Sequence, residues 1–150
     1  MTHEELCCQI VAGTQEAIIF ADAEGLIRLW NAGAETMFGY SAEEAKGQSL
    51  DLIIPERQRA PHWEGYRKVM ETGTTRYGRE LLAVPAMRKD GTRISLEFSI
   101  MLLREGAGKL TGAVAIMREV TARWQQDRAL KQRVAELEAQ VKRLEAEKKE

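Results

Sequence analysis

The spacing of apolar residues at the start of the chain predicts one helix and then a β-hairpin. Residues 3–14 place Leu6 and Ile10 on one side of a helix. Residues 17–21 and 26–30 are short apolar runs, and an acidic turn that ends in glycine separates them. Two such runs around a turn are typical of paired antiparallel strands.

The next part of the chain predicts three helices. Residues 31–39 have a helical composition that ends at a glycine, and Ser41 with Glu44 forms the capping box of a second short helix. A longer helix is expected from residue 61 to residue 72, because its opening proline suits a first turn and a glycine follows it. His62 would then lie at the positive end of the helix dipole, which disfavours the imidazolium form.

The pattern changes to strands in the second half. Residues 79–88, 92–103 and 110–118 have the composition of strands, and an Asp-Gly pair at 90–91 joins the first two as a hairpin. Polar and apolar residues alternate within the second of these strands, as in a half-buried strand. Two strands, several short helices and three more strands predict an α+β fold with a five-stranded antiparallel sheet and flanking short helices.

The C-terminal residues carry a heptad repeat. Apolar residues recur there at alternating spacings of four and three, at Leu130, Val134, Leu137, Val141 and Leu144. Valine at a and leucine at d favour a parallel two-stranded coiled coil, whereas a single solvated helix of this length is marginal. We therefore expect an N-terminal cap helix in residues 1–14, a folded domain in 15–121 and a coiled-coil dimerisation helix in 122–150.

Composition excludes several partners and compartments. The 150 residues include 22 basic and 23 acidic side chains, and a net charge of −1 gives no electrostatic basis for binding nucleic acid. No apolar run reaches the roughly 20 residues that span a membrane, and the N-terminus lacks the basic region of a signal peptide. The adjacent Cys7 and Cys8 suit neither a disulfide framework nor a zinc site, so we expect a cytoplasmic protein.

One histidine carries the candidate chemistry. The chain has two histidines, and only His62 lies within the expected folded domain, since His3 is near the N-terminus. A neutral imidazole is the commonest protein ligand for metals, including haem iron, although most lone histidines bind nothing. The sequence offers no catalytic triad, acid–base pair, phosphate loop or kinase motif, so we do not expect an enzyme.

Several local sequences resemble those of PAS domains. They are an opening hairpin and helix in residues 22–27 and 30–35, two helices in 38–47, the Arg-Lys-Asp-Gly turn at 88–91, and Glu119-Val120-Thr121 before the last helix. PAS domains usually end in a similar Asp-(Ile/Val)-Thr. The resemblance covers roughly residues 10–121. It implies a PAS sensor domain, a sensory and dimerisation module that acts through a C-terminal signalling coiled coil.

Within that family the chain is most similar to the haem-binding PAS domains of bacterial oxygen-sensor kinases. Ile53-Ile54-Pro55-Glu56 and a basic stretch precede His62 as they precede the iron ligand there. The resemblance implies that His62 is the proximal ligand of haem b. It also places basic side chains near the haem propionates and apolar side chains on the gas-binding face, namely Lys68 and Arg76, and Phe98 and Ile100.

Leu82 marks a departure from those oxygen sensors. They place an arginine over the bound gas at this position, and leucine offers no hydrogen-bond donor to oxygen. Arg79 would lie on the opposite face of a strand and cannot simply substitute. Any haem here is therefore expected to bind oxygen weakly and to suit carbon monoxide, nitric oxide or redox sensing. A second protein ligand is open, with Met87, Met101 and Met117 as candidates.

These features lead to one expected function and one alternative. The chain is expected to be a haem-binding sensor of a diatomic gas or of redox state. It would form a homodimer through its PAS domain and coiled coil, and it would signal to a kinase or other output domain outside this chain. The alternative is a cofactor-free or flavin-binding PAS module that mediates dimerisation of a signalling protein. The absence of a Gly-Arg-x-Cys motif disfavours a flavin thioether.

Overall fold

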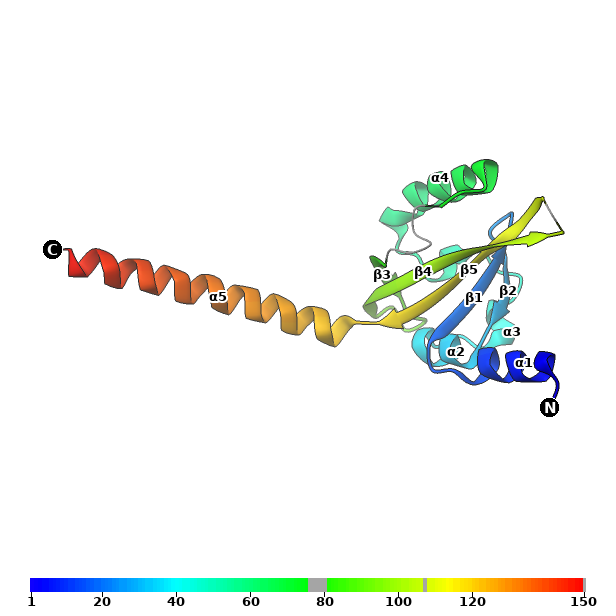
Figure 1. Ribbon diagram of the computed structural model, residues 1–150, viewed down its shortest axis with the longest axis horizontal. Coiled ribbons are helices and arrows are strands. Elements are labelled where there is room, and N and C mark those ends of the chain that lie inside the picture. The colour runs from blue at the N-terminus through cyan, green and yellow to red at the C-terminus, as the bar shows by residue number, and fades with distance from the viewer. Residues whose placement is uncertain (76–80, 107, 150) are drawn as a thin grey trace. The chain divides into compact units, whose positions relative to one another are not determined.

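The computed structural model describes residues 1–75, 81–106 and 108–149, which divide into two compact units, 1–119 and 120–150. The second unit consists of α5 (Thr121–Lys148) (Figure 1). The elements of the first unit are, in chain order, α1 (His3–Gly13), β1 (Ala17–Asp22), β2 (Ile27–Trp30), α2 (Ala32–Phe38), α3 (Ala42–Ala45), the 3₁₀ turn η1 (Leu50–Leu52), α4 (Glu56–Thr72), β3 (Leu82–Met87), β4 (Arg93–Glu105) and β5 (Lys109–Glu119).

Among the described residues, five strands form one antiparallel sheet in the order β2-β1-β5-β4-β3. The last strand, β5, lies at the centre, where it pairs with β1 on one side and β4 on the other. Ala17 of β1 is opposite Met117 of β5, so the first and the last strand of this unit pair in the middle of the sheet. The sheet and its flanking helices confirm the expected α+β fold.

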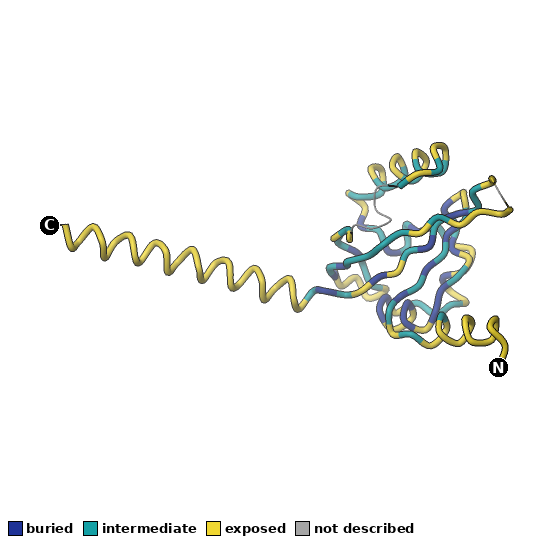
Figure 2. The backbone as a smooth tube through the Cα atoms, in the orientation of Figure 1, coloured by how far each residue is buried: buried dark blue, intermediate teal, exposed yellow. Residues whose placement is uncertain are grey.

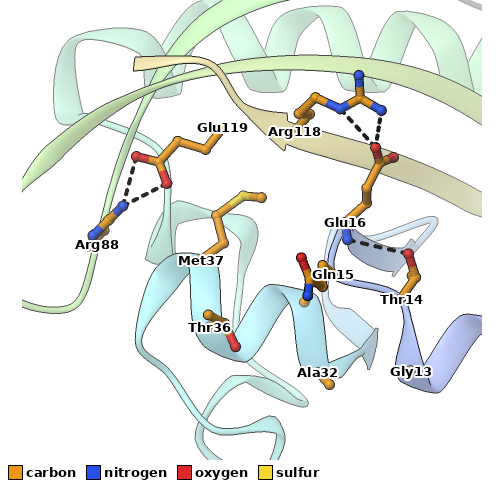
Figure 3. Close-up of a pocket in the computed structure, with 11 residues that line it drawn as sticks. Gly13, Thr14, Gln15, Glu16, Ala32, Thr36, Met37, Arg88, Arg118 and Glu119 are labelled. Carbon is orange, nitrogen blue, oxygen red and sulfur yellow. Dashed lines mark hydrogen bonds and ion pairs between the residues drawn. The ribbon is translucent and has the colours of Figure 1, made fainter. Parts of the chain in front are cut away.

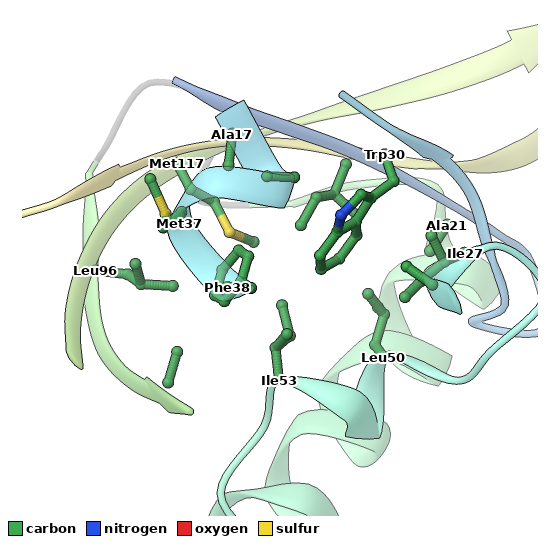
Figure 4. Close-up of a cluster of buried hydrophobic side chains, with 14 of the residues drawn as sticks. Ala17, Ala21, Ile27, Trp30, Met37, Phe38, Leu50, Ile53, Leu96 and Met117 are labelled. Carbon is green, nitrogen blue, oxygen red and sulfur yellow. The ribbon is translucent and has the colours of Figure 1, made fainter. Parts of the chain in front are cut away.

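One face of the sheet carries the core. Ala17, Ile19 and Ala21 are buried because alternate residues of β1 point to the same face. Phe38 of α2 and Trp30 of β2 meet them there, with 5.4 Å between their ring centroids (Figure 4). Burial is concentrated on this sheet face and on α2, whereas α1 has no buried residue and is largely exposed (Figure 2).

A buried asparagine ties the N-terminal elements together. Asn31 is 6% exposed, and its side-chain oxygen accepts hydrogen bonds from the backbone nitrogens of Ile18 and Ala34. Its side-chain nitrogen donates to the carbonyl oxygens of Val11 and Glu16. The same amide therefore caps α2 and connects α1, β1 and the segment between them, with every polar group of a buried side chain satisfied.

The long helix α4 begins earlier than the sequence predicts. It starts at Glu56, with Pro55 as its N-cap, and Pro61 lies inside it. The prediction that Pro61 opens the helix is therefore wrong. Pro55 already supplies the fixed φ that favours a helix start, and α4 continues through Pro61 although that residue lacks an N–H for the hydrogen-bond ladder and its ring crowds the preceding turn. Because α4 begins at Glu56, His62 lies in the second turn of the helix, away from the positive end of the helix dipole.

The helix α5 runs through the predicted heptad repeat. Its five heptad residues are all exposed in the single chain, as a helix that pairs with a second chain requires. The coiled coil itself stays a prediction. Across the described residues, none of the helices has the length and the hydropathy that crossing a membrane demands.

Candidate functional site

His62 lies in an aromatic cluster on α4. The centroid of its ring is 4.7 Å from that of Trp63, edge to face, and 5.8 Å from that of Tyr66. The histidine is half-buried, and its Nδ1 atom is buried without a hydrogen-bond partner among the described residues. A buried polar nitrogen is normally satisfied, so the unpartnered Nδ1 requires an explanation.

Burial keeps the imidazole of His62 neutral. It lowers the pKa of His62 from the ordinary value of 6.5, and the nearby carboxylate of Asp51 opposes the shift only in part. The expected neutral form is thus present, but desolvation rather than the helix dipole favours it. A neutral ring nitrogen is the form that ligates a metal.

The side chains of Trp63 and Tyr66 form hydrogen bonds that connect α4 to η1 and to the end of β1. Trp63 Nε1 donates a hydrogen bond to Oδ1 of Asp51, a residue of η1, at 2.7 Å. Tyr66 Oη lies 2.6 Å from the carbonyl oxygen of Asp22 and 3.2 Å from that of Ala21, at the end of β1. Gly25 permits this packing, because a Cβ there would lie 2.2 Å from the Trp63 ring. Sequence reasoning missed Asp51, since nothing in its local pattern marks it as a partner of α4.

The sheet offers an incompletely covered apolar surface on its core face. Leu82 is opposite Phe98, and Phe98 is opposite Met117, so these side chains share one face across β3, β4 and β5. Ile100 lies on that face too. Leu96 of β4 is only 2% exposed, whereas Phe98 and Ile100 further along the strand are half-buried. The structure therefore brings Leu82, Phe98 and Ile100 together, on the face against which Trp63 and Tyr66 of α4 also pack.

Known proteins share this fold. The family model described as the PAS fold matches residues 11–125, well over half of the chain. The chain belongs to the PAS-fold family. The crystal structure of a PAS domain from Colwellia psychrerythraea superposes with a TM-score of 0.71 at 23% identity, over 81% of this chain and 99% of that one. The PAS domain of BvgS from Bordetella pertussis gives 0.62 at 16%, over 89% and 97%.

Two sensor proteins are similar in sequence to this PAS domain. Sensor protein FixL of Bradyrhizobium diazoefficiens is 32% identical over 149 residues, which cover 97% of the chain. Oxygen sensor protein DosP of Escherichia coli is 31% identical over 74 residues, or 49% of the chain. The chain spans only 28% of the length of FixL and 9% of that of DosP.

The other expected site residues of the PAS domain separate into three groups. Lys68 is exposed on α4. Arg76 and Arg79 lie outside the described residues. The three methionines divide between the faces of the sheet, because Met87 and Met101 alternate with the core-facing residues of β3 and β4. Met87 and Met101 thus point away from the surface that holds Leu82 and Phe98, and only Met117 points toward it.

The PAS domain also has a hollow that sequence reasoning did not predict. Its volume is about 740 Å³, and it lies where the segment before β1, α2 and the end of β5 meet (Figure 3). Glu16 accepts a hydrogen bond from Arg118 Nε at 2.8 Å, and Glu119 accepts one from Arg88 Nη2 at 2.7 Å. These partners are far apart in sequence, and their charges neutralise each other in pairs. Within the described ranges, no three histidine, cysteine or carboxylate side chains converge as a metal site.

The lowered pKa of His62 predicts how the stability of the haem-free chain depends on pH. The unfolded chain takes up a proton on this histidine near its ordinary pKa of 6.5, whereas the folded chain does so only at lower pH. The free energy of unfolding should therefore decrease as the pH falls from 7.5 through about 6.5. Urea unfolding at several pH values measures this slope.

The variant His62→Gln should reduce the slope, because it removes the titrating group from a site that still accommodates a polar side chain. His3→Gln is the matched control, since His3 is exposed on α1. An unchanged slope in His62→Gln, or an equal change in the control, would contradict the prediction.

Proposed function

We propose that this PAS domain is a sensory module that binds haem b through His62 and responds to a diatomic gas or to redox state. The observation that carries the proposal is the buried and unpartnered Nδ1 of a neutral imidazole. Burial without a competing hydrogen-bond partner at Nδ1 leaves this imidazole neutral, and a neutral imidazole is the form that binds haem iron. The names of two relatives, a sensor protein and an oxygen sensor protein, support a sensory role.

The apolar surface on the core face of the sheet suits a large apolar cofactor. Leu82, Phe98 and Met117 form adjacent cross-strand pairs, and the half-buried part of this surface extends along β4 to Ile100. Covering that surface with a porphyrin would remove further apolar area from water. Lys68, which is exposed, and Arg76 are proposed to pair with the propionates. When bound, haem would supply an iron centre that can coordinate a gas or change its oxidation state.

Leu82 sets the expected ligand preference. Its cross-strand pairing with Phe98 directs it to the core face of the sheet, where it contributes only apolar surface. Oxygen gains more than carbon monoxide from a hydrogen-bond donor, because charge accumulates on oxygen when it binds iron. We therefore propose weak oxygen affinity, and a better fit to carbon monoxide, nitric oxide or redox sensing.

Two surfaces of the chain suit a homodimer. The heptad residues of α5 are exposed. In the PAS unit, the face of the sheet opposite the core also displays large apolar side chains: Met101, Leu103 and Ile116 are 52%, 37% and 37% exposed. We propose that a second copy covers both surfaces. Output through a kinase or another domain outside this chain, in the cytoplasm, is part of the same proposal.

Haem binding is tested by absorbance after reconstitution of the purified chain. A Soret band should appear, and His62→Ala should lose or shift it. Added imidazole should restore the band in His62→Ala, because the free ligand fills the space of the missing ring. His3→Ala is the control and should leave the spectrum unchanged. A chain that stays colourless overturns the proposal and leaves the cofactor-free module, while a flavin spectrum in the purified chain supports the flavin alternative.

The variant Leu82→Arg should raise the oxygen affinity of the haem-loaded chain. A charge-assisted hydrogen bond contributes about 1.5–3 kcal/mol, which corresponds to a decrease of roughly 10- to 100-fold in the oxygen dissociation constant. Leu82→Met is the matched control, since it keeps a long side chain without a donor. Gas titration followed by absorbance measures both variants, and equal oxygen affinities in the two would contradict the role of Leu82.

The coiled coil is tested by placing lysine at both Val141 and Leu144. Loss of apolar burial and charge repulsion at the interface should raise the dimer dissociation constant at least about 10-fold, for a cost of 1.4 kcal/mol or more. The matched control places lysine at Ala139 and Ala146, which lie on the opposite face of the heptad. Sedimentation equilibrium distinguishes the two, and identical self-association would show that α5 is not the main interface.

A further inference from the structure

The helix α1 carries a histidine and a cysteine on one face. His3 and Cys7 are four residues apart, so they lie one above the other on the helix surface. A complete capping box fixes the first turn: Glu5 N donates to Thr2 Oγ1 at 3.1 Å, and Thr2 N donates to Glu5 Oε2 at 2.7 Å. The side chains of His3 and Cys7 are both exposed. The position of the pair is thus determined by a regular, capped helix turn.

The two donor atoms have the separation of ligands that share one zinc ion. Cys7 Sγ lies 3.6 Å from His3 Nε2. Zinc binds sulfur at about 2.3 Å and imidazole nitrogen at about 2.0–2.1 Å, and tetrahedral angles then place the two ligand atoms about 3.6 Å apart. The distance between the two atoms is therefore compatible with a shared metal ion. The cysteine spacing alone suits no zinc site, and the contribution of His3 changes that conclusion.

One chain supplies only half of the ligands. A structural zinc site takes four protein ligands, and the described residues contain no group of three such side chains. On the same side of α1 as His3, Leu6 is 45% exposed and Ile10 is 59% exposed, at spacings of three and four. These apolar side chains suit pairing of α1 with the α1 of a second chain. Such pairing would bring two histidines and two cysteines together.

We propose that His3 and Cys7 form half of a tetrahedral zinc site, which the same two residues of a second copy complete. Two thiolates and two neutral imidazoles neutralise the charge of one zinc ion, and two histidines with two cysteines are an established structural zinc donor set. Each thiol releases its proton to solvent as its sulfur binds the metal. The site requires no haem and is separate from His62.

The test uses the full chain, prepared without haem and kept reduced. Cobalt(II) added in place of zinc should produce the intense visible bands of a tetrahedral ion and a sulfur-to-cobalt band, and both should saturate at one cobalt per two chains. Zinc should abolish these bands. Cys7→Ser and His3→Ala should each lose them. Cys8→Ser should keep them, because the next residue along a helix is turned by roughly 100° away from the pair.

A second measurement connects the metal to dimerisation. In the chain with lysine at Val141 and Leu144, zinc should restore self-association, and the additional change Cys7→Ser should remove that effect. None of the residues of α1 is buried, so these variants leave the core intact. The proposal is overturned if the cobalt bands survive Cys7→Ser or are lost in Cys8→Ser. Saturation at one cobalt per chain overturns the shared site, and haem binding is unaffected by any of these outcomes.

Discussion

The candidate site depends on how α4 is held against the sheet. None of the residues of α4 is fully buried, so apolar packing alone fixes this helix weakly. Directional hydrogen bonds contribute to its position, among them those from Trp63 to Asp51 and from Tyr66 to the backbone at the end of β1. The same two rings pack against His62. The groups that anchor the helix therefore also bury the imidazole, and burial is what keeps the imidazole neutral.

Much of the fold follows from local sequence patterns. The alternation of polar and apolar residues in β4, the Asp-Gly turn before it and the N-cap residue Ser41 each dictate one local conformation. Because the elements and their order resemble a known family, the sheet could be predicted as well. The start of α4 could not, since Pro55 and Pro61 are both compatible with a first turn, and packing of the helix rather than proline geometry decides between them.

The site was predicted in part, and the errors have physical causes. The alternation of side chains along β4 places Phe98 and Ile100 on one face and Met101 on the other, so the sequence itself already contained the reason to exclude Met101. The bond from Trp63 to Asp51 had no such signal, because it depends on the path of the chain between η1 and α4. The ion pair of Arg118 with Glu16 likewise requires the placement of β5 beside β1.

The apolar character that β3 gives to the proposed site does not depend on the exact register of this strand. Leu82 faces the core because it is opposite Phe98, which is opposite Met117 on the central strand. A shift of β3 by one residue would turn Leu82 outward and Leu81 or Ala83 inward, and none of these three side chains can donate a hydrogen bond. The apolar character of this part of the surface is thus insensitive to small errors of register. A donor over the site would require either a substitution on β3 or a residue from another element, which makes Leu82→Arg a direct test of what the strand contributes.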